Sequence, residues 1–248
     1  MPSPRGGEME LCFLGSGNAF APQRYWNSFL LNDRYLFDPS PIALPHLKRL
    51  KKDLDGIDVV FISHFHGDHF FGLPFLLLEY GELNHRTQDL VIVGPRGLRE
   101  KVEGLTEAGF PGLLEKSSKY QRHYLEVDEN DEQRVGGLPF QAVRVEHVSN
   151  LECYGFQVRL NGKTLAYSGD AVLCDGVWRL SKGADVFVVE CSCWEATCGP
   201  HMSPDDIRRL RKETPLETPF ILTHMDAGKG NIGSEGIQLA EDLATYRF

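Results

Sequence analysis

The chain has 248 residues, of which 42% are hydrophobic and 25% charged, a composition typical of a folded globular protein and not of a disordered or fibrous one. A layered fold of this length needs no second domain, so we predict one domain over residues 1–248. The formal net charge of −9 disfavours strong nonspecific binding to nucleic acid, because its field repels polyanions at long range, but it permits a small anionic substrate at a metal site.

Short apolar runs and helical patterns alternate along the first half of the chain. Runs rich in β-branched and aromatic residues, set apart by Gly, Pro and Asn, are typical of strands. These runs are residues 9–14, 29–31, 35–37, 58–62 and 90–93. Apolar residues that return every three or four positions predict helices at residues 42–54, 67–79 and 98–108.

The second half repeats this alternation. Strands are predicted at residues 140–145, 153–160, 164–167, 185–189 and 220–223, and Asn161-Gly162 is a hairpin signal between two of them. Helices are predicted at residues 205–212 and 235–245. Strands interleaved with helices over the whole length indicate a layered α/β fold.

The composition also bears on the cellular compartment. The start of the chain, Met1 to Gly7, has no apolar signal region, and no later window is apolar over the length of a bilayer span. We therefore expect a cytoplasmic protein with no membrane partner. The six cysteines have no zinc-finger or CxxC spacing and are expected to be reduced thiols of the core: Cys12, Cys153, Cys174, Cys191, Cys193 and Cys198.

The most informative segment is Ser63-His64-Phe65-His66-Gly67-Asp68-His69, which follows an apolar strand. Side chains two apart in an extended segment point the same way, so His64 and His66 can reach one ion. Gly67 lets the chain turn, and Asp68 and His69 then face a second position nearby. Imidazole with carboxylate suits zinc, although manganese or iron is also possible, so the spacing predicts two metals. Ordinary core or surface histidines explain such a dense cluster poorly.

This motif resembles the His-x-His-x-Asp-His signature of the metallo-β-lactamase superfamily. His147, Asp170 and His224 each follow an apolar strand and occur in the order of that superfamily. The resemblance implies a four-layer αβ/βα sandwich with the metals at one edge of its two sheets.

The resemblance also implies how the ligands are shared. His64, His66 and His147 would hold the first Zn2+, Asp68, His69 and His224 the second, and Asp170 would bridge both. Iron-binding relatives often carry Glu at the position of His66, which favours zinc here. Taken alone, His147 and His224 are as compatible with core histidines as with ligands.

A centre with two metal ions predicts a hydrolase. A water shared by two cations should be largely deprotonated near neutral pH, and Asp68 would orient it or take its proton. His201 is the candidate donor to the leaving group. It precedes a predicted helix with Ser203 as cap, Pro204 at the first position and Asp206 as capping-box acid, a place that favours phosphate. A surface loop histidine is the alternative.

Within the superfamily the chain resembles the ribonuclease Z branch, through Phe70-Phe71-Gly72-Leu73-Pro74 after the motif and the acid of Val189-Glu190. In that branch a histidine at the position of His201 assists the leaving group and a glutamate like Glu190 orients it. The resemblance therefore implies a phosphodiesterase.

Three departures argue against maturation of transfer RNA in particular. His147 precedes Asp170 by only 23 positions (170 − 147), which leaves no room for the long arm that grips transfer RNA. Where the ribonuclease Z branch has a turn like Asp-Cys-Gly-Glu, this chain has Asp38-Pro39-Ser40-Pro41. The segment after His224 also differs from that branch, because it is Met225-Asp226-Ala227 here. A small or compact phosphodiester, such as a cyclic nucleotide or an RNA end, becomes the leading substrate.

Two other functions remain open at this point. The same centre could hydrolyse a carboxylic ester, a lactone or a thioester, because its nucleophile attacks a carbonyl equally well. A non-catalytic metal-binding protein is the second alternative. A homodimer is expected by analogy alone.

Overall fold

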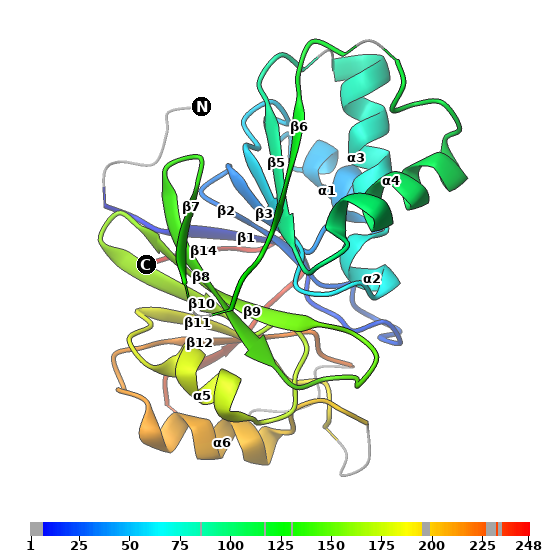
Figure 1. The fold of residues 1–248 in the computed structure, drawn as a ribbon. Helices are drawn as coiled ribbons and strands as arrows, with labels where there is room; N and C mark the ends of the chain where they lie inside the picture. Colours follow the sequence, from blue (N-terminus) through cyan, green and yellow to red (C-terminus); the bar gives the residue numbers. More distant parts are fainter. Residues whose placement is uncertain are drawn as a thin grey trace.

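The computed structural model describes residues 7–84, 86–116, 118–129, 131–194, 199–226, 232 and 235–248. Within them, the first half of the chain and the C-terminal strand β14 build a seven-stranded mixed sheet with the order β14-β1-β2-β3-β4-β5-β6 (Figure 1). Its strands are β1 Glu10–Gly15, β2 Ser28–Leu31, β3 Tyr35–Phe37, β4 Val59–Phe61, β5 Leu90–Gly94, β6 Arg122–Glu126 and β14 Thr245–Arg247.

The second half builds a sheet of the same size, with the order β13-β12-β11-β10-β9-β8-β7. Its strands are β7 Glu132–Val135, β8 Leu138–Val145, β9 Cys153–Leu160, β10 Lys163–Tyr167, β11 Val186–Glu190, β12 Phe220–Thr223 and β13 Ile237–Leu239. β10, β11 and β12 are parallel, so their carboxyl ends reach the same edge of the sheet.

Helices cover the outer face of each sheet. The first sheet carries α1 Ala43–Arg49, α2 Gly67–Phe70, α3 Leu73–Glu79, the π-helical turn η1 Tyr80–Asn84 and α4 Leu98–Gly109. The second sheet carries α5 Asp175–Ser181 and α6 Pro204–Glu213. The four layers are therefore helices, sheet, sheet and helices, as the resemblance implied.

Aromatic side chains hold the two sheets together. Phe29, Phe37 and Phe61 stack across neighbouring strands of the first sheet, with ring centroids 4.6 and 4.7 Å apart. Phe156 of the second sheet meets Phe61 at 5.2 Å in an edge-on contact. Each of these rings is at most 1% exposed, and burial of aromatic surface on this scale is a main source of stability.

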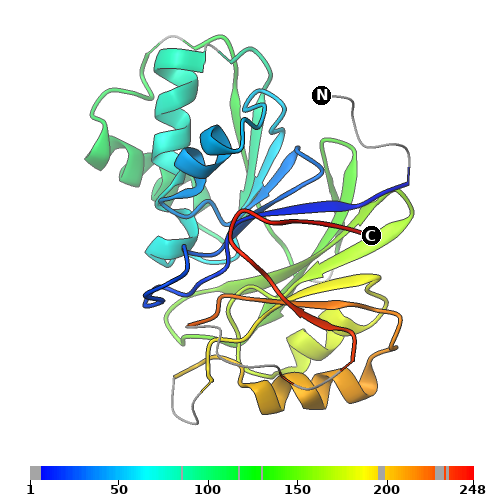
Figure 2. The ribbon, with the colours of Figure 1, turned by 180° about the vertical axis from the view of Figure 1, so that it is seen from behind.

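The helix predicted at residues 235–245 is wrong. These residues instead include β13, which pairs with β12, and they lead into β14, which pairs with β1 of the other sheet. Figure 2 shows the red C-terminal segment crossing from one sheet to the other. The apolar spacing of this segment fits a helix as well as two short strands, and distant partner strands decide between the two.

The structure also differs from the sequence prediction in smaller ways. The helix predicted at residues 67–79 is divided into α2 and α3 at Gly72, where a Cβ atom would lie 2.0 Å from the carbonyl oxygen of Ser40. Strands β6 and β7 and helix α5 were not predicted. None of the described helices has the length and apolarity that a membrane span requires.

The prediction for the cysteines holds in part. Cys12, Cys153, Cys174 and Cys191 are free thiols in the core. Cys193 is disulfide-bonded, which corrects the expectation for that residue. Cys198 lies outside the described residues.

Candidate metal centre

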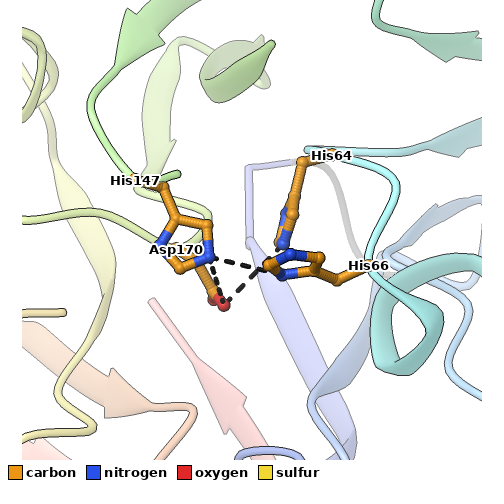
Figure 3. Close-up of side chains that lie close together, drawn as sticks. All are labelled: His64, His66, His147 and Asp170. Atoms are coloured by element: carbon orange, nitrogen blue, oxygen red, sulfur yellow. Dashed lines mark hydrogen bonds and ion pairs between the residues drawn. The ribbon is translucent and has the colours of Figure 1, made fainter. Parts of the chain in front are cut away.

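A first group of side chains gathers where β4, β8 and β10 end. His64 and His66 follow β4, His147 follows β8, and Asp170 follows β10. Figure 3 shows the three imidazole rings and the carboxylate converging from these segments. Their ligand atoms all lie within 4.8 Å of one another, which is close enough to hold one metal ion.

A second group contains Asp68, His69 and His224, again with ligand atoms within 4.8 Å. His69 Nε2 lies 3.2 Å from His224 Nε2, and His224 Nε2 lies 3.3 Å from Asp68 Oδ2. The residues of this group come from two short segments that follow strands of different sheets. Asp68 and His69 belong to α2, and His224 directly follows β12.

Asp170 stands between the two groups. Its Oδ2 atom lies 3.3 Å from His69 Nε2 and 3.4 Å from His224 Nε2 in the second group, and 3.8 Å from His64 Nε2 in the first. The structure thus brings all seven side chains that the sequence singled out as ligands into one cluster, with Asp170 at the position of a shared ligand.

Local backbone geometry aims two of these residues inward. His224 has a φ of +52°, a left-handed conformation that costs an imidazole-bearing residue of the order of 1–3 kcal/mol. Asp170 is preceded by Gly169 with a φ of +58°, where an added Cβ would lie 2.7 Å from the carbonyl oxygen of Tyr154. Only glycine fits there without strain, because any other residue would have an unfavourable backbone torsion and its Cβ atom would clash with the neighbouring strand.

Asp38 supports the second group from behind. This fully buried carboxylate accepts hydrogen bonds from His69 Nδ1 at 2.8 Å, from the Tyr167 hydroxyl at 2.6 Å, and from the Ser63 backbone N–H and hydroxyl at 2.7 Å each. A proton on His69 Nδ1 leaves the Nε2 lone pair free to point into the cluster. This pairing of carboxylate and imidazole is typical of histidines that bind metals.

Other groups fix the remaining rings in the same way. His224 Nδ1 lies 2.8 Å from the Ser192 hydroxyl, and His147 Nδ1 lies 2.9 Å from the carbonyl oxygen of Pro200. His64 Nδ1 lies 3.0 Å from the Ser63 hydroxyl. In each case the other ring nitrogen is left for the cluster.

The residues present fit metal ions. His64 Nε2 and Asp170 Oδ1 are buried and have no hydrogen-bond partner, although such atoms in protein interiors are nearly always satisfied. His147 Nε2 also faces His66 Nδ1 at 3.3 Å, a contact between ring nitrogens that favours a proton or a cation between them. Imidazole and carboxylate donors in these numbers suit zinc, and also manganese or iron.

The charges within the cluster also favour a cation. Burial alone would raise the pKa of Asp170, but His224 and His69 outweigh it and hold the pKa well below its usual range. Burial opposes protonation of His69, yet Asp170, Asp68 and Asp38 hold the pKa of its ring well above the ordinary value. The carboxylates thus remain ionised and attract positive charge to the centre.

His201 and Glu190 form a pair beside both groups. His201 Nδ1 lies 2.9 Å from Glu190 Oε1 and 4.0 Å from Asp170 Oδ2. Burial by itself would lower the pKa of His201, but the hydrogen bond that its ring donates to the Glu190 carboxylate raises this pKa to about 9. The predicted capping box of α6 is present, because Ser203 and Asp206 exchange side-chain to backbone hydrogen bonds.

Glu190 is itself fully buried and held from several sides. Its carboxylate accepts hydrogen bonds from the backbone N–H groups of Ala171, Ser192 and Met202 and from the Ser192 hydroxyl. Ser192 therefore touches both Glu190 and His224, and connects the His201 pair to the second group of ligands.

One pocket of about 510 Å³ opens onto this arrangement. Its lining includes residues of both groups and His201, together with several apolar residues. The lining residues are Asn18, Ala19, Phe20, His66, Gly67, Asp68, His147, Val148, Asp170, Ser192, Pro200, His201, His224 and Asp226.

Asp38 and Ser192 are site residues that the sequence does not predict. For Asp38, the available signal is an acid directly after an apolar strand. No local signal marks Ser192, whose hydroxyl gains its role from His224, 32 positions away.

Comparison with known proteins identifies the family of the chain. Residues 33–225 match the model of the family described as the β-lactamase superfamily domain. Ribonuclease BN of Escherichia coli O7:K1 is 32% identical over 277 residues, which cover 88% of this chain and 90% of that protein. Ribonuclease Z of Clostridium perfringens is 29% identical over 168 residues, 62% of this chain and 53% of that protein, so this alignment spans about half of the relative.

Solved structures share the fold. The short form of human tRNase Z superimposes with a TM-score of 0.76 at 24% identity, covering 96% of this chain and 98% of that one. A diphosphatase from the PhnP family has a TM-score of 0.74 at 19% identity, with 97% and 98% covered.

Proposed function

Because the chain belongs to the β-lactamase superfamily, we propose that it is a metal-dependent hydrolase with a two-metal centre that cleaves a compact phosphodiester. One observation supports this most directly. Asp170 lies between the two groups of ligand atoms, and His201, whose ring is held by Glu190, lines the same pocket as residues of both groups.

The metal ligands follow from this arrangement. We assign one ion to His64, His66 and His147, and a second to Asp68, His69 and His224, with Asp170 shared between them. Zinc is the preferred ion for these donors, and manganese or iron would also be accepted. When bound, two such ions lower the pKa of a water held between them and draw charge from a phosphoryl oxygen of the substrate.

Asp68 and His201 would move the protons. The oxygen of the attacking water bonds to phosphorus, the ester bond from phosphorus to the leaving oxygen breaks, and that oxygen takes a proton from His201. Asp68 orients the attacking water as a hydrogen-bond acceptor and takes its proton, and its carboxylate is ionised for this role because the nearby His69 and His224 outweigh the effect of burial and lower its pKa. Glu190 holds the ring of His201 in place through Nδ1.

The closeness of Glu190 also governs the charge of His201. Its carboxylate stabilises the protonated imidazole, which raises the pKa of His201 to about 9. A general acid must carry the proton that it donates, and this pairing keeps the imidazole of His201 protonated at neutral pH.

The relatives favour a phosphodiester, and the charge of the chain favours a compact one. The ribonucleases named above act on RNA, whose backbone is a chain of phosphodiesters. The net charge of −9 disfavours a long polyanion. A cyclic nucleotide or an RNA end is therefore our proposed substrate, and cytoplasmic location and a homodimer stay predictions.

Metal content and substrate range can be measured on one preparation. Protein loaded with zinc would be analysed for metal stoichiometry and assayed on bis(p-nitrophenyl) phosphate, a 2′,3′-cyclic nucleotide, an aryl ester and a set of lactones. We expect two ions per chain and turnover of the phosphodiesters. Lactone or thioester turnover without phosphodiester turnover would assign the carboxylic ester alternative, and two bound ions without any turnover would favour a non-catalytic protein.

A further inference from the structure

An exposed aromatic ring lies on the wall of the pocket. Phe20 is 90% exposed and lines the same pocket as Asp68, Asp170 and His201. Single exposed apolar side chains are common on protein surfaces. Phe20 differs from an ordinary one because its ring borders the space in which a substrate would reach the proposed ligands.

The backbone that carries this ring is held firmly. Asn18 Oδ1 accepts a hydrogen bond from the Phe20 backbone N–H at 3.0 Å, and the Asn18 backbone N–H donates to the carbonyl oxygen of Met225 at 3.0 Å. The indole N–H of Trp26 donates to the carbonyl oxygen of Ala19 at 3.3 Å. A ring on an anchored turn binds a ligand without first ordering a loop, which favours binding.

A carboxylate also lines the pocket. Asp226 is exposed, lines the pocket, and follows Met225, whose carbonyl oxygen is bonded to the turn that carries Phe20. The pocket therefore offers an aromatic face together with a hydrogen-bond acceptor. A nucleobase matches both, because it has a flat π-face and N–H donors at its edge. An acyl chain matches only the ring and would remove water from the carboxylate without replacing its hydrogen bonds.

We propose that Phe20 determines specificity by stacking on the base of a nucleotide whose phosphodiester lies at the metal ligands. This inference rests on the proposed function and names its substrate class as base-bearing phosphodiesters. In the reaction, water adds to phosphorus and the bond from phosphorus to a ribose oxygen breaks. That oxygen leaves with one proton, and the base stays on Phe20 throughout.

The test compares two cyclic phosphodiesters that differ in the base. kcat/KM would be measured for 2′,3′-cyclic AMP and for glycerol 1,2-cyclic phosphate, and the ratio of the two values reports the contribution of the base. Because stacking of one base on an aromatic side chain contributes about 1–3 kcal/mol, Phe20→Ala should lower this ratio by roughly 5- to 150-fold. Phe20→Trp should preserve or raise it, because the larger ring still stacks.

Phe75→Ala is the matched control. Phe75 is also a partly exposed phenylalanine, at 48%, but it packs against Phe110 and is absent from the lining of the pocket. This variant should keep the wild-type ratio. A Phe20→Ala variant that also keeps the wild-type ratio, whether its activity is unchanged or falls equally on both substrates, would overturn the proposal.

A binding measurement separates this inference from the proposed function. Calorimetry on metal-loaded protein would compare adenosine monophosphate with ribose 5-phosphate. Tighter binding of the nucleotide that Phe20→Ala abolishes supports the base site. If wild-type protein hydrolyses neither cyclic substrate, the proposed function fails. The difference in affinity between the two ligands then tests by itself whether Phe20 binds a base. Equal affinity of the wild-type protein for the two ligands would refute the base site.

Discussion

Asp38 is a residue on which several buried polar contacts behind the centre converge. It has a φ of +46° and is fully buried, and its carboxylate accepts four hydrogen bonds from Ser63, His69 and Tyr167. A neutral amide in its place would turn a donor toward groups that are themselves donors. The orientation of His69 would then lose its support.

We therefore expect Asp38→Asn to weaken metal binding at the group formed by Asp68, His69 and His224. Loss of such outer support typically costs about 10- to 100-fold in metal affinity. Metal stoichiometry after dialysis against a series of metal buffers measures the effect. Asp33→Asn is the control, because Asp33 pairs with Lys52 at the surface. Wild-type affinity at both sites in the Asp38 variant would contradict the role assigned here.

His201 can be tested through the leaving group. Its replacement by Ala should slow hydrolysis of a 2′,3′-cyclic nucleotide by about 10²- to 10⁴-fold, the usual contribution of a positioned general acid. Hydrolysis of bis(p-nitrophenyl) phosphate should suffer far less, because p-nitrophenolate leaves without a proton. Initial rates on the two substrates supply the comparison.

His123→Ala provides the control for this experiment, since His123 is half exposed and pairs only with Asp89 among the described side chains. It should retain wild-type rates on both substrates. Equal losses on both substrates in the His201 variant would show that this residue acts on binding or folding and not as an acid.

At the scale of single elements, α6 shows how a helix start serves the site. Ser203 and Asp206 close the capping box one turn into the helix, and His201 lies two residues before Ser203. The backbone N–H of Met202 donates to Glu190, so the same segment is tied both to the helix and to the pair at the pocket. The capping box thus stabilises the start of α6, which closely follows the site residue His201.

Ser203→Ala should lower the free energy of unfolding by about 0.5–2 kcal/mol, because the backbone N–H of Asp206 loses its acceptor. Urea unfolding followed by circular dichroism would measure the change. Ser203→Thr keeps an oxygen at the same position and should unfold close to the wild-type midpoint. If the Ala variant shares that midpoint, the capping box contributes nothing measurable.

At the scale of the whole molecule, the centre joins the two sheets at one edge. His64, His66, Asp68 and His69 follow β4 of the first sheet, while His147, Asp170 and His224 follow strands of the second. Both groups of ligands contain residues from both sheets. Any ion that binds there links the two halves of the fold, in addition to the aromatic core between them.

Removal of metal should therefore destabilise the entire fold. A ligand that binds only the folded chain stabilises it by about 2.7 kcal/mol at a concentration one hundred times its Kd. A chelator should accordingly lower the unfolding temperature of the metal-loaded protein in a calorimetric scan. Asp170→Ala lacks the shared ligand and should respond weakly. A wild-type unfolding temperature that is insensitive to chelator would argue against ions at this position.

The sequence by itself determined much of the centre. Three histidines and an aspartate within His64–His69 could be predicted as ligands, because their local spacing directs their side chains to two neighbouring metal positions. The remaining ligands could be predicted because each follows an apolar strand and because they occur in the order of the superfamily. These ligands are His147, Asp170 and His224. Parallel strands bring such ends to one edge, so the layered fold and the cluster could be expected together.

Only the tertiary structure decided what depends on contacts between distant segments. Asp38 supports His69 across 31 positions, and Ser192 meets His224 across 32, so no local pattern could reveal either. The apolar spacing of residues 235–245 predicts a helix, but β12 and β1 offer edges to which these residues add as strands. A pairing edge or a buried hydrogen-bond partner is a property of the assembled chain, because its free energy exists only once the partner is in place.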